Sequence, residues 1–154
     1  MTRHVTVVRA ALPSEARALT ALAIRSKAHW GYDAAFMERA ALDLEMTPEL
    51  IEGAAVFVAE SGTDVLGFYV LASADGVPML RDLWVDPAAI GMGVGARLWA
   101  HMLEQARRLG YRTVRIQSEP NAEGFYVKMG ARRVGFAEST VVKGRMLPLM
   151  EILT

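Results

Sequence analysis

Three glycines mark the part of this sequence that is best suited to binding an anion. Gly91, Gly93 and Gly95 stand between a predicted strand, 79–85, and a predicted long helix that begins near Val94. Glycine accepts positive φ angles and has no side chain to block an approaching ligand. The first turn of a helix carries unpaired N–H groups and partial positive charge, which suits phosphate. We expect a pyrophosphate site here; the alternative is that the glycines only permit tight packing.

The spacing of these glycines differs from two common nucleotide-binding loops. A P-loop requires Lys followed by Ser or Thr, which is absent after Gly95. A dinucleotide loop has the spacing G-x-G-x-x-G, which is also absent. The stretch from Leu83 to Gly95 instead resembles the acyl-CoA loop of the Gcn5-related N-acetyltransferases, R/Q-x-x-G-x-G/A after a hydrophobic-x-Val-Asp-Pro strand end. Ile90 replaces the Arg/Gln of that motif, which leaves phosphate recognition to backbone N–H groups.

The resemblance implies which residues hold the cofactor, acetyl-CoA. In the family, the strand before the loop separates from its neighbour and frees backbone groups for the pantetheine arm and the thioester oxygen. The implied cofactor-binding positions in the strand and loop are Leu83, Trp84, Val85, Gly91, Met92, Gly93, Val94, Gly95 and Ala96. An N–H aimed at the developing oxyanion would accelerate acyl transfer. We expect the Trp84 side chain itself to pack rather than react.

A second motif lies downstream. The segment from Asn121 to Ala131 is similar to the family's N-A-x-x-F-Y-x-x-x-G-F segment. The resemblance implies that Asn121 and Phe125 belong to the cofactor site and that Tyr126 protonates the departing CoA thiolate. A phenol with a pKa of about 10 is protonated at pH 7 and can donate. The alternative is that Asn121 only caps a helix whose core the two aromatic rings fill.

The sequence offers few candidates for a general base. Alternation along strand 79–85 places Met79 and Arg81 on the face of Val85, and Asp82 on the opposite face. Glu119, beside the second motif, is the candidate that remains. A chain of water molecules without a dedicated side chain is the other candidate, and Glu119 would then be a solvated loop residue.

Aromatic and polar residues gather after the first predicted helix. His29, Trp30, Tyr32 and Asp33 lie within five residues, where the family lines its acceptor pocket. The resemblance implies that His29, Trp30 and Tyr32 bind the acceptor amine. The alternative is a turn whose aromatic rings hold two helices together.

Composition excludes several classes of protein. Basic and acidic residues balance at 17 each, so we expect no nucleic-acid partner. The absence of cysteine excludes a disulfide framework and a thiol nucleophile. We expect no metal, because the three histidines lack ligand spacing: His4, His29 and His101. No apolar run approaches the about 20 residues that span a membrane, and no signal-peptide pattern begins the chain, so we expect a cytoplasmic protein.

Residue periodicity predicts a mixed α/β fold. Strands are predicted at 5–9, 55–59, 65–72, 79–85, 114–116, 133–137 and 146–152. Helices are predicted at 14–27, 33–44, 94–109 and 121–129, capped at the first two by Ser14 and Asp33. A single turn is predicted at 47–49, capped by Thr47 with Pro48 at its first helical position. The crossover from 79–85 to 114–116 should be parallel. The order β-α-α-β-β-β-α-β-α-β-β is that of the acetyltransferase fold, so we expect a single N-acetyltransferase domain over 1–154.

The expected function is transfer of an acetyl group from acetyl-CoA to a primary amine, on a small molecule or a protein N-terminus. Without cysteine or a Ser/His/Asp signature, we expect direct attack in a ternary complex. The alternative is a non-catalytic acyl-CoA-binding or regulatory module on the same fold, which Ile90 favours and Tyr126 disfavours. A nucleotide-phosphate binder is a third, weaker alternative.

The segment 145–152 is unusually apolar. It would either complete the sheet within one subunit or lie at a dimer interface, and Pro148 suggests an edge position or a bulge. We expect a homodimer.

Overall fold

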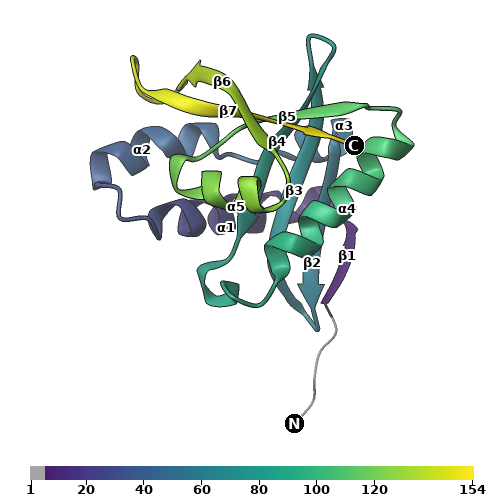
Figure 1. The fold of residues 1–154 in the computed structure, drawn as a ribbon. Coiled ribbons are helices and arrows are strands. Elements are labelled where there is room, and N and C mark those ends of the chain that lie inside the picture. Colours follow the sequence, from purple (N-terminus) through teal and green to yellow (C-terminus); the bar gives the residue numbers. More distant parts are fainter. Residues whose placement is uncertain (1–5) are drawn as a thin grey trace.

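A seven-stranded mixed sheet runs through the computed structural model, which describes residues 6–154 (Figure 1). The strands are β1 (Thr6–Ala10), β2 (Ala55–Ser61), β3 (Asp64–Ala74), β4 (Val77–Val85), β5 (Thr113–Gln117), β6 (Arg132–Glu138) and β7 (Met146–Leu153). The helices are α1 (Ala16–Ala28), α2 (Ala34–Asp43), α3 (Pro48–Gly53), α4 (Val94–Arg108) and α5 (Glu123–Lys128). The predicted element order is thus confirmed with one added helix, α3; Val5 and His4 lie outside the described residues.

The pairing of the strands creates an opening in the middle of the sheet. The strand order is β1-β2-β3-β4-β5-β7-β6, and β1 to β4 form an antiparallel meander. The α4 crossover makes β4 and β5 parallel, as predicted, but their register contains the single pair Met79 and Arg115. Beyond that pair the two strands separate, so the carboxyl-terminal half of β4 pairs with β3 alone.

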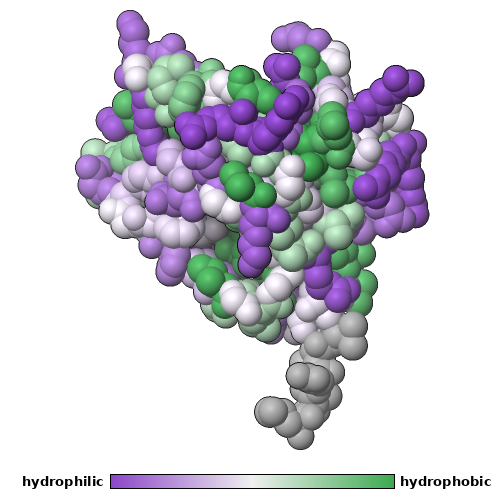
Figure 2. Space-filling model, in the orientation of Figure 1, coloured by the Kyte–Doolittle hydropathy of each residue, from purple (hydrophilic) through white to green (hydrophobic). Residues whose placement is uncertain are grey.

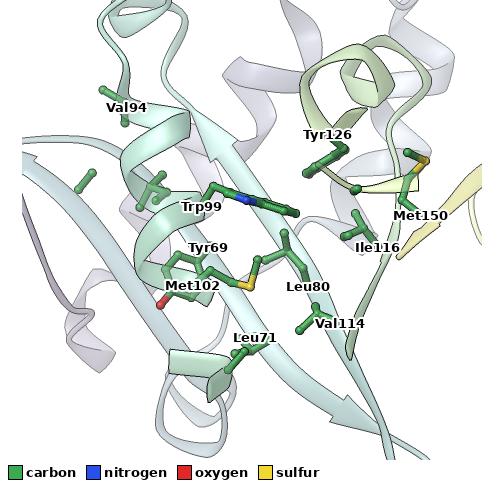
Figure 3. Packing of buried hydrophobic residues seen from close by; sticks show 14 of the residues in the cluster. Tyr69, Leu71, Leu80, Val94, Trp99, Met102, Val114, Ile116, Tyr126 and Met150 are labelled. Carbon is green, nitrogen blue, oxygen red and sulfur yellow. The ribbon is translucent and has the colours of Figure 1, made fainter. Parts of the chain in front are cut away.

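Two apolar layers hold helices against the sheet. On one face α4 and α5 cover a cluster that includes Tyr69, Trp99, Met102 and Ile116 (Figure 3). On the other face α1 and α3 cover a second cluster, which includes Phe68. Every buried residue of α4 faces the sheet cluster, whereas Leu109 at the C-cap, which helical spacing places on the same stripe, is 51% exposed. No helix within residues 6–154 is long and apolar enough to cross a membrane.

Local capping differs from the prediction at one helix and agrees at two. Ser14 does not cap α1, because 13–15 forms a 3₁₀ turn and the Glu15 carboxylate accepts the Leu12 N–H at 2.8 Å. Asp33 caps α2 by accepting the Phe36 N–H at 2.8 Å. The Thr47 cap and the proline that follows it start a six-residue helix, α3, rather than a single turn.

β7 lies between β5 and β6, so the apolar carboxyl-terminal segment completes the sheet within one chain. The expected edge position of Pro148 is therefore wrong, whereas the expected bulge lies close by, since the pairing of β6 with β7 shifts register opposite Leu149 and Met150. The ladder between β7 and β5 ends at Leu149, so Pro148 lies just outside it. The Pro148 carbonyl accepts the Ser118 N–H at 2.8 Å. Because the N–H and C=O of a strand residue point the same way, the missing N–H of Pro148 removes no bond to β6.

Candidate functional site

The opening between β4 and β5 forms a cavity of about 560 Å³. Its walls are β4, the loop before α4, the first turn of α4, and the segment from β5 to α5. The predicted cofactor-binding residues that line it are Leu83, Trp84, Val85, Gly91, Gly93, Val94, Gly95, Ala96, Asn121 and Phe125. Met92 is the predicted cofactor-binding residue that does not line the cavity, and 63% of its surface is exposed. Two motifs far apart in the sequence therefore meet around one cavity.

The three glycines of the loop have different structural roles. Gly91 and Gly93 have φ angles of +85° and +77°, which other residues rarely adopt. Gly93 is the N-cap of α4 and offers no side-chain hydrogen bond, so the first N–H groups of the helix remain open to a ligand. Gly95 serves packing instead, because a Cβ there would lie 3.2 Å from the Phe125 ring. The tight-packing expectation thus holds for Gly95, and the anion site at Gly91 and Gly93 stays a prediction.

The surface beside the loop is of mixed hydropathy. Figure 2 shows apolar residues among hydrophilic ones on the face that carries α4 and α5. Ile90 is 54% exposed and brings no polar group to the loop. Any phosphate bound here would depend on backbone N–H groups and the dipole of α4.

An acidic residue of β4 lines the cavity, which the sequence analysis did not predict. Val70 pairs with Asp82 whereas Leu71 pairs with Leu80, so Arg81 is an extra residue that interrupts the alternation of β4. From Asp82 to Val85 the register is regular, so Asp82 shares the face of Trp84 and lies opposite Val85, as predicted. Both Arg81 and Asp82 nevertheless line the cavity, because β4 and β5 separate there. The expectation that this parity removes Asp82 from the site is therefore wrong.

Asp82 is a buried acid with one free oxygen. The residue is 8% exposed, and its Oδ1 accepts the Trp84 Nε1–H at 3.1 Å. Its Oδ2 is buried without a hydrogen-bond partner among the described residues, and Arg81 Nε lies 3.7 Å away. Burial raises the pKa of Asp82, against the opposing effects of the Arg81 charge and the Trp84 hydrogen bond. Such a carboxyl group holds its proton more tightly than an exposed one.

Glu119 has the opposite environment. Its side chain is 9% exposed and forms an ion pair with Lys27 Nζ at 3.1 Å. It also accepts hydrogen bonds from the Tyr32 hydroxyl and, at 2.7 Å, from Asn121 Nδ2. Burial alone would raise the pKa of Glu119, but these hydrogen bonds and the Lys27 charge outweigh it and hold the pKa below its ordinary value. Glu119 is therefore not a solvated loop residue.

Tyr126 lies between the apolar core and the cavity. Its ring packs against Trp99 with centroids 5.7 Å apart (Figure 3), and the residue lines the cavity. Its hydroxyl makes no hydrogen bond to another residue of the described part of the chain. Burial raises the pKa of Tyr126, and the negative charges of Asp82 and Glu119 raise it further, so the phenol stays protonated.

The three residues expected to bind the acceptor separate into two groups. His29 and the 46%-exposed Trp30 line the same cavity as the glycine loop. Tyr32 instead joins the Glu119 network and stacks on Phe36 of α2, with centroids 4.2 Å apart. The alternative, that an aromatic residue of this turn holds two helices together, is thus correct for Tyr32.

A second cavity of about 400 Å³, which the sequence did not reveal, meets the first. The two share five lining residues at the strand opening: Arg81, Asp82, Trp84, Gln117 and Glu119. Its other walls are the end of α2 and the loop between β6 and β7, with Asp43 and Arg145 among their polar side chains. A reactant in each cavity would meet at Asp82. No group of three His, Cys, Asp or Glu residues within 6–154 is arranged to hold a metal ion.

An N-acetyltransferase is among the curated proteins that are similar to this chain. Glucosamine 6-phosphate N-acetyltransferase 1 of Oryza sativa subsp. japonica is 32% identical over 114 residues, 73% of this chain. The chain spans 66% of the length of that relative.

Two solved structures share the fold. A GCN5-related N-acetyltransferase from Rhodopseudomonas palustris has a TM-score of 0.83 at 21% identity, covering 100% of this chain and 99% of its own. The PaiA N-acetyltransferase from Thermoplasma acidophilum, solved in complex with coenzyme A, has a TM-score of 0.75 at 16% identity, covering 97% and 99%. The predicted fold class is confirmed. Residues 20–131 match the acetyltransferase (GNAT) family, and the chain belongs to that family.

Proposed function

We propose that this acetyltransferase (GNAT) family member transfers the acetyl group of acetyl-CoA to a primary amine, by direct attack in a ternary complex. The observation that carries the proposal is the meeting of two cavities at the buried carboxylate of Asp82. One cavity begins at the open N-terminus of α4, which suits a pyrophosphate. The other brings polar side chains to the same opening. The relatives support the assignment, since the solved PaiA protein holds coenzyme A.

The unpaired half of β4 suits the pantetheine arm. Successive strand residues turn their backbone groups to opposite sides, so among Leu83, Trp84 and Val85 those that do not bond to β3 face the gap left by β5, where an extended amide chain can pair with them. An N–H of this strand would stabilise the oxyanion that forms at the thioester carbon. Asn121 and Phe125 line the opposite wall.

We assign the general base to Asp82 rather than to Glu119. Asp82 has a free oxygen and a raised pKa, whereas Glu119 is occupied by Lys27, Tyr32 and Asn121 and has a lowered one. Asp82 accepts the proton that the amine loses as its nitrogen attacks the thioester carbon. The C–S bond then breaks, and Tyr126 donates its proton to the CoA thiolate. The products are an amide and free CoA, and no acyl-enzyme is needed.

The experiment measures coenzyme A binding by calorimetry and thiol release from acetyl-CoA with a panel of primary amines. The proposal predicts tight CoA binding, no ATP binding and amine-dependent thiol release. CoA binding without turnover of any amine would instead support the non-catalytic acyl-CoA-binding module. ATP binding without CoA binding would support a nucleotide-phosphate binder.

The finer expectations also stay proposals. The acceptor is a small-molecule amine or a protein N-terminus, His29 and Trp30 contact it or the cofactor, and residues 1–154 work as a single domain in the cytoplasm. A homodimer is supported by the edge position of β6 and by exposed apolar residues on β6 and β7: Val134, Phe136, Met146 and Leu153. Light scattering at micromolar concentration tests it, and a monomeric mass would exclude it.

A further inference from the structure

Arg145 is a half-buried cation that forms no ion pair with a carboxylate among residues 6–154. Among residues 6–154, six arginines form no ion pair with a carboxylate. Five of them are exposed to water, which solvates their charge: Arg17, Arg39, Arg97, Arg107 and Arg112. Arg145, the sixth, is half-buried. A partly desolvated charge is costly unless an opposite charge or hydrogen bonds replace the lost water.

The surroundings of Arg145 hold its guanidinium in place without neutralising it. The guanidinium carbon lies 4.9 Å from the centre of the Phe36 ring and 5.2 Å from that of Tyr32. One N–H donates to the Tyr32 hydroxyl at 2.9 Å, which leaves most of the five N–H groups free. Lys27, which contacts the same two rings, is neutralised by Glu119. The geometry leaves Arg145 ready for a planar or phosphate-like anion.

The backbone around Arg145 is equally well held. Its carbonyl accepts the Ser139 N–H at 2.7 Å, and its own N–H donates to the Val142 carbonyl at 3.1 Å. The Ser139 hydroxyl in turn accepts the N–H groups of Val141 and Val142. The loop between β6 and β7 is thus closed by its own hydrogen bonds, with Arg145 at its base.

Arg145 lines the second cavity and not the one that begins at the glycine loop, so the phosphates of CoA are not its partner. Asp82, whose Oδ2 is buried without a hydrogen-bond partner among the described residues, also lines this second cavity. We propose that the acceptor is a small primary amine that also carries a carboxylate or a phosphate, with the anion at Arg145 and the amine at Asp82. This inference rests on the proposed function and specifies its substrate class. The volume of about 400 Å³ fits a small molecule.

Matched pairs of amines test the charge requirement. The first arm compares amino acids with their carboxamides, and the second compares phosphoethanolamine with ethanolamine. Binding to the CoA complex is measured by calorimetry, and turnover by thiol release from acetyl-CoA. The charged member of at least one pair should bind about 10- to 150-fold more tightly, the range for a hydrogen bond to a charged group. The arm that responds identifies the anion as carboxylate or phosphate.

Arg145→Gln should remove that preference and leave the affinity for CoA unchanged. Arg108→Gln, an exposed arginine on α4, is the matched control and should keep the preference. Equal binding, or equal absence of binding, by the charged and uncharged members of every pair would overturn the inference. A preference that persists in the Arg145→Gln variant would also overturn it.

The charge requirement and the acetyltransferase activity can be refuted separately. Turnover of uncharged amines as fast as charged ones would leave the acetyltransferase proposal intact and remove this one. Charge-dependent binding through Arg145 without any thiol release would support this inference and contradict the proposed catalysis.

Discussion

Replacing Asp82 by Asn should separate activity from stability, because the carboxylate is both buried and free on one side. The variant keeps the shape of the side chain and an oxygen for the Trp84 hydrogen bond but cannot accept a proton. General-base catalysis contributes about 10²–10⁴-fold in typical enzymes. A primary amine with a pKa of about 10.4 is neutral in roughly 1 of 2,500 molecules at pH 7. We therefore expect kcat/KM at pH 7 to fall by about 10²- to 10³-fold.

This defect should shrink as the pH rises. At pH 9 the neutral fraction of such an amine is about 1 in 25, about 100-fold more than at pH 7, so the reaction depends less on deprotonation by Asp82. The wild-type rate should rise as the pH passes through the elevated pKa of Asp82. The rate of the variant should instead rise only with the neutral fraction of the amine. The assay is thiol release from acetyl-CoA between pH 6 and pH 9, with the best acceptor of the panel.

The same substitution should stabilise the fold at neutral pH. Burial raises the pKa of Asp82 above 3.8, so the folded state holds its proton more tightly than the unfolded state. The ionised carboxylate therefore costs stability above the folded pKa, and that cost disappears as the pH falls toward 3.8. Asp82→Asn should melt higher at pH 7, by about 2–4 °C for each kcal/mol gained, and should lose this pH dependence. A variant that is less stable, or whose activity loss is independent of pH, would refute the reasoning.

Three further substitutions test the rest of the site. Glu119→Gln should destabilise the fold at pH 7 by about 3–5 kcal/mol, since it leaves the largely buried Lys27 without a counterion. Because the pKa of Glu119 is lowered in the folded state, the stabilising effect of the wild-type carboxylate should be present above pH 4.5 and lost as the pH falls through the folded pKa. Urea denaturation at several pH values would show this loss. Tyr126→Phe should lower kcat by about 10²-fold with little change in the KM for acetyl-CoA, and a kcat within twofold of wild type would reject the acid assignment. Gly93→Val should weaken CoA binding at least about 10-fold in calorimetry through strain at φ +77°. The added Cβ meets no protein atom within 4 Å, so the fold should survive, and unchanged affinity would exclude the loop from the site.

The parts of the molecule that follow local rules were predictable. The glycines at positive φ, the Asp33 and Thr47 caps and the parallel crossover all depend on neighbouring residues or on chain handedness. The bulge at Arg81 was not predictable, because it is a property of the pairing between β4 and β3 rather than of β4 alone.

The second cavity escaped prediction for a related reason. Its walls come from α2, β4 and the loop before β7, and nothing in the spacing of Asp43, Asp82 and Arg145 indicates that they share one cavity. Glu119 was identified from its place beside a motif, but its partners Lys27 and Tyr32 lie about 90 residues earlier in the chain. Tertiary contacts of this range decide whether a carboxylate acts as a base or as half of an ion pair.

The placement of β7 has a consequence for the order in which the molecule is built. β5 shares one registered pair with β4, so its main hydrogen-bonding partner is β7. During synthesis β5 leaves the ribosome well before β7, and until then the strand that leads into Glu119 and Asn121 has almost no sheet to join. The meander β1 to β4 can form earlier from contacts close in sequence. The cavity between β4 and β5 should therefore be among the last features to appear during folding, and a nascent chain halted before β7 should bind no CoA.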